Sequence, residues 1–264
     1  MDQTTRLLAS YAAELSYAAL TASAVHQCKR RIIDTLACAT AAFDSEPVTI
    51  ARRMARSRHS THPSRVLGDG HETTPEMAAF VNGAMVRFLD WNDTLMLEGS
   101  GHPSDCFGAV LAVADCRGLG GKELILGTVT AYEMFRAIAA QVNLRERGWD
   151  QSLYVVLGSA AAAGQLLGLP VDHLGEALAI AVTANVATRQ TRAGELSMWK
   201  GLATPLAASS GVLATLMAAE GITGPTEAFE GHHGIWDQVT GPIQISGLGG
   251  QEDAPFAVEC SHLK

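Results

Sequence analysis

Aromatic residues are scarce in this sequence. Tryptophan, tyrosine and phenylalanine make up 6% of the 264 residues, whereas hydrophobic residues as a whole make up 47%. Much of the apolar content is therefore alanine and leucine, which are good helix formers. A chain of this length can bury a substantial core, so a helical globular protein is expected.

Positive net charge and long apolar runs are also lacking. The formal net charge is −8, which argues against a nucleic-acid groove or an anionic membrane surface, because both need a basic face. No apolar run reaches the length of about 18 residues that a membrane span requires. The N-terminus lacks the basic start and unbroken apolar core of a signal peptide. A locally cationic pocket stays compatible with an acidic chain.

Paired metal and disulfide motifs are missing as well. The cysteines are widely spaced and form no CxxC motif, which argues against a disulfide scaffold or a zinc ribbon. They are Cys28, Cys38, Cys106, Cys116 and Cys260. The pair His232-His233 has no carboxylate or cysteine beside it at a ligand-like spacing. We interpret it as a surface turn, expect no metal, and expect a reduced cytoplasmic protein.

Helical periodicity dominates what is present. Apolar residues recur at steps of three and four, as on one face of a helix. This pattern predicts helices within residues 22–43, 74–90, 104–118, 121–142, 159–169, 171–189 and 204–222. Ser104 is expected to cap the third of these and Gly118 to end it. Small residues at 160–164 and 207–211 would let helix axes approach closely. The fold class predicted is all-α, a compact multi-helix domain.

The composition changes near Gly241. Phe256, Val258 and Cys260 alternate as the residues of a strand do. A lone strand has no partner for its backbone groups. We therefore expect residues 1–240 to form the helical domain, and residues 241–264 to be a linker and the first strand of a second, α+β lid domain truncated at the C-terminus.

Hydrogen-bonding side chains gather in "LDWNDTLMLEGSGHPSD", residues 89–105. Asp90 and Thr94 are four residues apart, so on a helical turn both would project from one side. His102 follows a Gly-Ser-Gly loop and precedes an expected helix start, where the dipole lowers the proton affinity of a histidine. A neighbouring aspartate could orient this imidazole. The alternative is that these side chains only cap helices.

A second polar segment, residues 188–203, brings together Arg189, Arg192 and Lys200. Three cations near one loop suit a polycarboxylate ligand. As solvated surface charges they would need no explanation, so this alternative stays open. The glycine-rich stretches at 99–102 and 247–250 do not follow a strand with a GxGxxG pattern, so nucleotide binding is not expected.

In these residues the sequence resembles the MmgE/PrpD family, which includes 2-methylcitrate dehydratase and cis-aconitate decarboxylase. The likeness runs from about residue 5 to residue 240 and rests on "NGAMVRFLDWNDT", "GHPSD", "GSAAAAGQLLGL", "MWKGLA" and "AAEGITGPTEAFEG" in that order. It implies an all-helical domain followed by a smaller α+β lid, with a catalytic pocket between them. It also implies a homodimer formed through the helical domain, and neither a metal nor an organic cofactor.

Matched residue by residue, the resemblance places the family's active-site side chains on Asp90, Thr94, His102 and Lys200. We expect His102 to transfer the proton and Asp90 to orient it or to act as the acid. Lys200 would hold a substrate carboxylate, Thr94 would hydrogen-bond the substrate, and Arg192 is a further candidate contact.

The resemblance thus implies a hydro-lyase that dehydrates 2-methylcitrate or a related small tricarboxylate. Two alternatives are kept. The first is a cis-aconitate decarboxylase-like enzyme, although that branch carries a histidine near the position of Asp150. The second is a truncated, inactive helical scaffold or dimerisation protein, because relatives continue for roughly another domain.

Overall fold

The segments with helical periodicity form helices in the computed structural model, which describes residues 1–251 and 254–264. In chain order the α-helices are α1 (Gln3–Glu14), α2 (Ala22–Ala42), α3 (Glu46–Ala55), α4 (Pro75–Arg87), α5 (Phe107–Cys116), α6 (Gly121–Ala139), α7 (Ser152–Leu167), α8 (Val171–Ala184), α9 (Ala203–Ala219) and α10 (Ala257–Cys260). The described strands, β1 (Ser64–Arg65) and β2 (Glu72–Thr73), form one antiparallel hairpin. The predicted all-α class is confirmed.

Short helices of other types connect these elements. The 3-10 helices are η1 (Tyr17–Ala19), η2 (Pro103–Cys106), η3 (Leu144–Arg147), η4 (Arg189–Arg192) and η5 (Met198–Gly201), and η6 (Trp236–Thr240) is a π-helix. None of the helices in the described part of the chain combines the length and the apolar character that a bilayer crossing demands.

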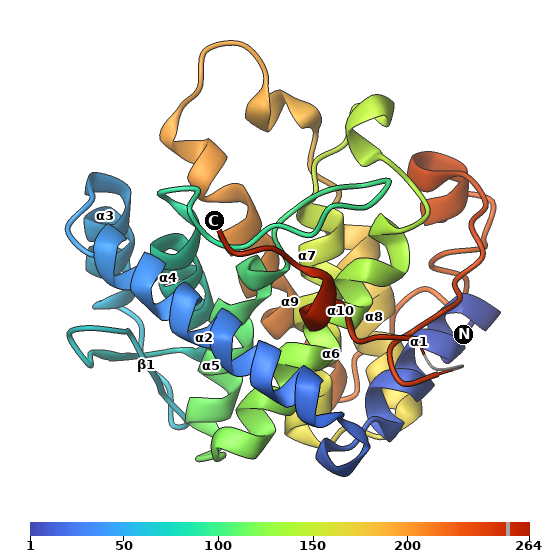
Figure 1. Cartoon of the computed structure of the whole chain (residues 1–264), viewed down its shortest axis with the longest axis horizontal. Coiled ribbons are helices and arrows are strands. Elements are labelled where there is room, and N and C mark those ends of the chain that lie inside the picture. The colour runs from blue at the N-terminus through green and yellow to red at the C-terminus, as the bar shows by residue number, and fades with distance from the viewer. Residues whose placement is uncertain (252–253) are drawn as a thin grey trace.

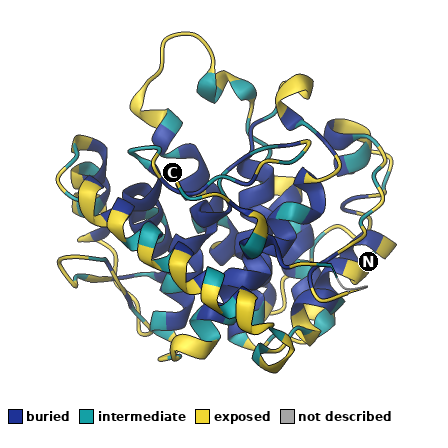
Figure 2. Ribbon diagram, viewed as in Figure 1, coloured by how far each residue is buried: buried dark blue, intermediate teal, exposed yellow. Residues whose placement is uncertain are grey.

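Helix α7 is the centre of the core. It packs against α6, α8 and α9, and all its residues except Gln165 and Leu167 are buried. A helix that is apolar all round is stable only inside a protein, and Figure 2 shows the central helices dark blue, with exposed residues along the outer face of α2. Figure 1 shows α2 crossing one side of the bundle.

Glycines set the distance between the central helices. A Cβ atom at Gly158 of α7 would lie 2.7 Å from the carbonyl oxygen of Ala131 on α6. A Cβ atom at Gly211 of α9 would lie 2.9 Å from the backbone nitrogen of Ala160 on α7. Both approaches are too close for a larger residue, so the small-residue surfaces predicted from sequence are packing surfaces.

The strand predicted near the C-terminus is wrong. The structure has α10 at Ala257–Cys260, with the Glu259 side chain accepting a hydrogen bond from the Phe256 backbone at 2.9 Å. Phe256 and Val258 are buried, and α10 packs against α2 and α6. Three alternating apolar residues fit one helical turn as well as a strand, and packing on the helical domain decided between them. The domain boundary at residue 240 stays a prediction.

Two local predictions on the polar segment are also wrong. Residues 90–94 are not a helical turn, because α4 ends at Arg87 and the chain continues as a loop. Ser104 does not cap α5, which begins three residues later at Phe107 and follows η2. The hydroxyl of Ser104 instead accepts a hydrogen bond from Asn92 at 2.8 Å. The predicted helix end at Gly118 is confirmed, since α5 ends at Cys116 and Gly118 has φ 62°.

Candidate active site

One carboxylate, that of Asp90, collects four nitrogen-bearing side chains. Its Oδ1 lies 2.6 Å from the Arg87 guanidinium and 3.5 Å from Nε2 of His102. Its Oδ2 lies 3.1 Å from Nζ of Lys200. Lys264 completes the group, with Nζ 3.6 Å from Oδ1 and 2.8 Å from the backbone carbonyl oxygen of Asp90. The side chains at 90, 102 and 200 are therefore neighbours, as the family resemblance implied.

The environment of Asp90 favours its ionised form. Burial alone would raise the pKa of this carboxyl, but the positive charge of Arg87 and the hydrogen bonds from Lys200 and Arg87 outweigh burial and hold the pKa well below its usual range. Asp90 also has φ 60°, the only positive φ of a non-glycine among the described residues. Such backbone strain is kept only where the surroundings fix it, and here the ion pairs do so.

His102 is held in one tautomer. Its Nδ1 lies 2.7 Å from the carbonyl oxygen of Asp93, which can only accept, so Nδ1 carries the hydrogen and the lone pair of the neutral ring is on Nε2. Burial is the main reason that the pKa of His102 is lowered below its usual value. The predicted lowering is confirmed, but its principal cause is burial rather than a helix dipole. The hydroxyl of Thr94 lies 3.4 Å from Nδ1.

The loop that carries His102 is fastened by buried Asp93. Its carboxylate accepts hydrogen bonds from the Tyr132 hydroxyl at 2.9 Å and from the Ser104 backbone at 3.2 Å. The backbone of Thr94 pairs with that of His262, with N–O distances of 2.8 and 2.7 Å. His102 and the C-terminal segment are therefore held against the same loop.

Arg87 is a site residue that sequence reasoning missed. Its side chain is 2% exposed and lies between Asp90 and the fully buried Asp105, 3.3 Å from the latter. Asn92 also donates to Asp105, at 2.8 Å. The available signal was an arginine at the end of a largely apolar helix, since a buried cation must be paired.

Arg192 was predicted to contact the substrate, but in the structure its side chain pairs with Asp150. Its Nε lies 2.6 Å from Oδ2 of Asp150, and the two side chains are 8% and 0% exposed. Its guanidinium also donates to the backbone carbonyl of Lys200 at 3.2 Å. Arg192 therefore fixes the backbone that presents Lys200 instead of facing an open space. Arg189 is not among the described side chains that contact Asp90.

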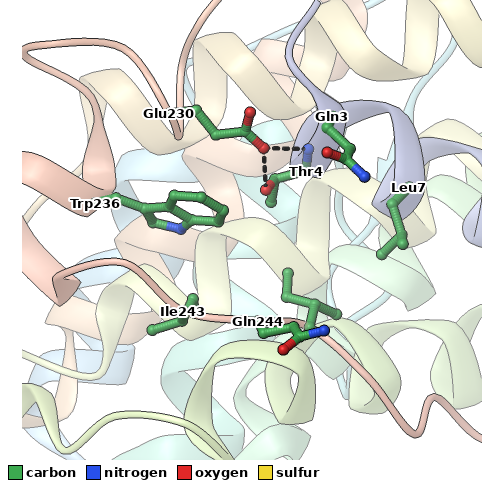
Figure 3. Close-up of a pocket in the computed structure, with 8 residues that line it drawn as sticks. Gln3, Thr4, Leu7, Glu230, Trp236, Ile243 and Gln244 are labelled. Atoms are coloured by element: carbon green, nitrogen blue, oxygen red, sulfur yellow. Dashed lines mark hydrogen bonds between the residues drawn. The ribbon is translucent and has the colours of Figure 1, made fainter.

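A cavity of about 630 Å³ adjoins this group. Its lining residues are Asp34, Ala37, Cys38, Ala41, Trp91 and Lys264. Asp90 does not line it, but Lys264 joins the two because its ammonium contacts Asp90. The volume is in the range of about 300–1,000 Å³ that small-molecule sites occupy. A separate cavity of about 400 Å³, shown in Figure 3, lies between α1 and the segment from Glu230 to Ile245 and shares no lining residue with it.

Asp34, on α2, is the second residue that sequence reasoning missed. Its Oδ2 is buried without a hydrogen-bond partner. Burial and the negative charge of Asp93 raise the pKa of this carboxyl, against the opposing charge of Arg31. Asp34 on the cavity wall and Asp90, which Lys264 links to that cavity, thus have pKa values displaced in opposite directions.

Comparisons with known proteins find sequence relatives of this chain. The 2-methylcitrate dehydratase of Cupriavidus necator is 31% identical over 183 residues, which are 64% of this chain and 38% of that protein. That of Salmonella typhimurium is 34% identical over 172 residues, 61% of this chain and 36% of the relative. Human cis-aconitate decarboxylase is 31% identical over 230 residues, 80% of this chain and 45% of that enzyme.

The matched part of the chain thus spans less than half the length of each of these three relatives. The sequence model of the MmgE/PrpD N-terminal domain matches residues 6–247. The chain therefore belongs to the MmgE/PrpD family.

Proposed function

We propose that this chain carries the helical-domain part of a hydro-lyase active site that removes water from 2-methylcitrate or a related tricarboxylate. The observation that carries the proposal is the position of His102, whose unprotonated Nε2 faces Asp90 beside two partly exposed ammonium groups. The names of the bacterial relatives support the same reaction class.

In the proposed first step, Nε2 of His102 takes a proton from the carbon next to a substrate carboxylate. The lowered pKa keeps the ring neutral near physiological pH, and Asp90 stabilises the imidazolium that forms. The ionised state of Asp90 suits this role and not that of the acid. A positioned base of this kind contributes roughly 10²–10⁴-fold to rate.

Substrate binding would fall to Lys200 and Lys264. Their side chains are 34% and 38% exposed, so each can reach a ligand, whereas Arg87 is 2% exposed. Two ammonium groups neutralise the carboxylate next to the reacting carbon, which lowers the cost of removing its proton. Thr94 would hydrogen-bond the substrate near the base. Arg192 would act indirectly, by holding the Lys200 backbone.

The leaving hydroxide needs a proton, and Asp34 is the proposed donor. Its pKa is raised and its Oδ2 is buried without a hydrogen-bond partner on the wall of the cavity, which supports the donor role. Loss of hydroxide from the carbon next to the carbanion centre forms the double bond, and the proton from Asp34 completes water.

Two further points belong to the proposal. The resemblance implies a homodimer through the helical domain. Leu206 and Leu213 of α9 support it, because they are 45% and 46% exposed and, at seven residues apart, lie on one face of the helix.

A reduced cytoplasmic location stays a prediction. All five cysteines are free thiols in the structure.

Cis-aconitate decarboxylation is the second candidate. The observation in its favour is the match to the human decarboxylase over 80% of this chain. Against it, the position where that branch carries a histidine holds Asp150, which is buried and committed to Arg192.

A direct assay tests the proposal. The purified chain is given 2-methylcitrate or citrate, alone and with a polypeptide corresponding to the C-terminal part of the Cupriavidus necator relative, and the absorbance of the conjugated product is followed. Product formation supports the dehydratase. No product in either mixture, from a chain whose circular dichroism shows intact helices, favours the scaffold alternative. Release of carbon dioxide from cis-aconitate identifies the decarboxylase instead.

A further inference from the structure

The histidine pair at 232–233 lies in a turn that the backbone holds firmly. Trp236 and Ile235 donate backbone hydrogen bonds to Phe229 and Ala228, both at 3.0 Å. A Cβ atom at Gly234 would lie 2.6 Å from the Phe229 carbonyl oxygen, so only glycine fits there. Phe229 is completely buried. The turn is therefore anchored to the core even though its two imidazoles are exposed.

The two rings converge instead of diverging. Nδ1 of His232 lies 3.2 Å from Nε2 of His233, and the ring planes are 88° apart. Nitrogen ligands at 2.0–2.1 Å from a tetrahedral zinc ion are about 3.3 Å from each other. Without a cation, the same distance allows one ring to donate a hydrogen bond to the other, so the two nitrogens are already as close as two ligands of one ion.

A carboxylate completes the group. Asp237 lies in the π-helix η6, four residues after His233, and its oxygen and the two ring nitrogens are all within 4.8 Å of one another. The side chain of Gln238 donates a hydrogen bond to Oδ2 of Asp237 at 2.6 Å. Hydrogen bonds of this kind orient metal ligands. The pair is an exposed turn, as the sequence indicated, but folding supplies the carboxylate that its spacing did not reveal.

From this geometry we propose that His232, His233 and Asp237 bind a divalent transition-metal cation such as Zn²⁺, Cu²⁺ or Ni²⁺. Two imidazoles and a carboxylate prefer these ions over Mg²⁺ and Ca²⁺, which favour oxygen ligands. Three protein ligands leave at least one coordination position open to water or to a further ligand.

The site is separate from the proposed active site. It adjoins the cavity in Figure 3, because Trp236, next to Asp237, lines that cavity with Glu230. It shares no residue with the group around Asp90. A test of metal binding at this site is therefore independent of a test of the dehydratase proposal.

Calorimetric titration of the tag-free chain with ZnCl₂ at neutral pH tests the site. We expect one zinc ion per chain, and no comparable heat with MgCl₂ or CaCl₂. His232→Ala, His233→Ala and Asp237→Ala should each weaken zinc binding by roughly 10–100-fold or more, since loss of an outer partner alone has an effect of that size. These side chains are exposed, so the variants should fold normally, as circular dichroism can verify.

The double variant His59→Ala/His62→Ala is the matched control, because it removes two exposed histidines from another turn. It should leave zinc affinity unchanged. The proposal is overturned by the absence of one-to-one binding to the unmodified chain, or by binding that survives all three substitutions at the site.

Discussion

Nε2 of His102 lies 3.5 Å from the carboxylate of Asp90, a residue held in a left-handed backbone conformation. In the neutral ring the hydrogen is on Nδ1, so Nε2 has none to donate to this carboxylate. Once Nε2 gains a proton, the imidazolium and the carboxylate attract each other as ions. In the proposed mechanism this arrangement leaves Nε2 of His102 free before proton transfer and stabilises the protonated ring afterwards, and several measurements can test this.

Removal of the imidazole should affect turnover more than binding. His102→Ala is expected to lower kcat by roughly 10²–10⁴-fold while KM changes little, because the ring acts in proton transfer. Steady-state kinetics in the active mixture measure both constants. His173→Ala, which removes an exposed histidine from α8, should leave them unchanged. An unaltered kcat in the His102 variant would remove this residue from the mechanism.

Activity and stability should both depend on the protonation of His102. Its folded pKa is lowered from 6.5, so the unfolded chain binds the proton more tightly. Its contribution to the free energy of unfolding is complete above about pH 6.5 and falls as the pH drops toward the folded pKa. The rate should rise with pH over the same window. Histidine NMR titration and urea unfolding measure the two effects, and a His102 pKa above 6.5 contradicts them.

The carboxyl of Asp34 should matter for catalysis but not for folding. Asp34→Asn is expected to lower kcat by roughly 10²-fold or more, since it removes the proposed proton donor. The melting temperature should not fall, because the carboxyl has an oxygen without a partner. Asp44→Asn, at an exposed position just after the same helix, is the control. Equal rates in the two variants would assign the donor role elsewhere.

The buried pair of Arg192 and Asp150 should stabilise the fold. Asp150→Ala leaves a guanidinium that is 8% exposed without its partner, a change that costs about 3–5 kcal/mol in comparable cases. Urea denaturation measures the free energy of unfolding. Asp115→Ala should cost much less, because its partner Arg65 is 66% exposed. Similar losses in the two variants would argue against a special role of the buried pair.

The proposed dimer can be tested on α9. The double variant Leu206→Asp/Leu213→Asp places two charges on the exposed apolar face and should weaken self-association at least about tenfold, because unpaired charges are costly at an interface. Analytical ultracentrifugation measures the association constant. Met54→Asp, at another exposed apolar residue that is 49% accessible, should not change it. Sedimentation of the unmodified chain as a monomer would refute the dimer.

The helical fold was predictable because its signal is local. Periodicity of three and four residues, with glycine at the ends, marked most of α2, α4, α6, α7 and α9. The failures came where tertiary contacts chose between local forms. Phe256 and Val258 join a helical turn because that turn packs on α2 and α6. Asp90 leaves the helix because Arg87, Lys200 and Lys264 hold its carboxylate in a loop.

The candidate site was predictable only in part. The resemblance singled out Asp90, His102 and Lys200, and the fold does bring them together. The resemblance did not reveal Arg87 or Asp34. Arg87 stands out because it is a buried cation, and Asp34 because a carboxylate oxygen is buried without a partner. Arg192 was chosen from the cluster of cations at 188–203, and in the structure it pairs with buried Asp150. The sequence of a loop does not distinguish a cation that faces a ligand from one that faces a buried carboxylate.

By itself the sequence determined where most of the longer helices lie, which family motifs they carry and which side chains can exchange protons. The tertiary structure decided which of these meet. Asp90 is 110 residues from Lys200 and 174 from Lys264 along the chain. Periodicity identifies the apolar face of each helix but not the partner of that face, so the charges around one carboxylate are fixed only when the helices pack.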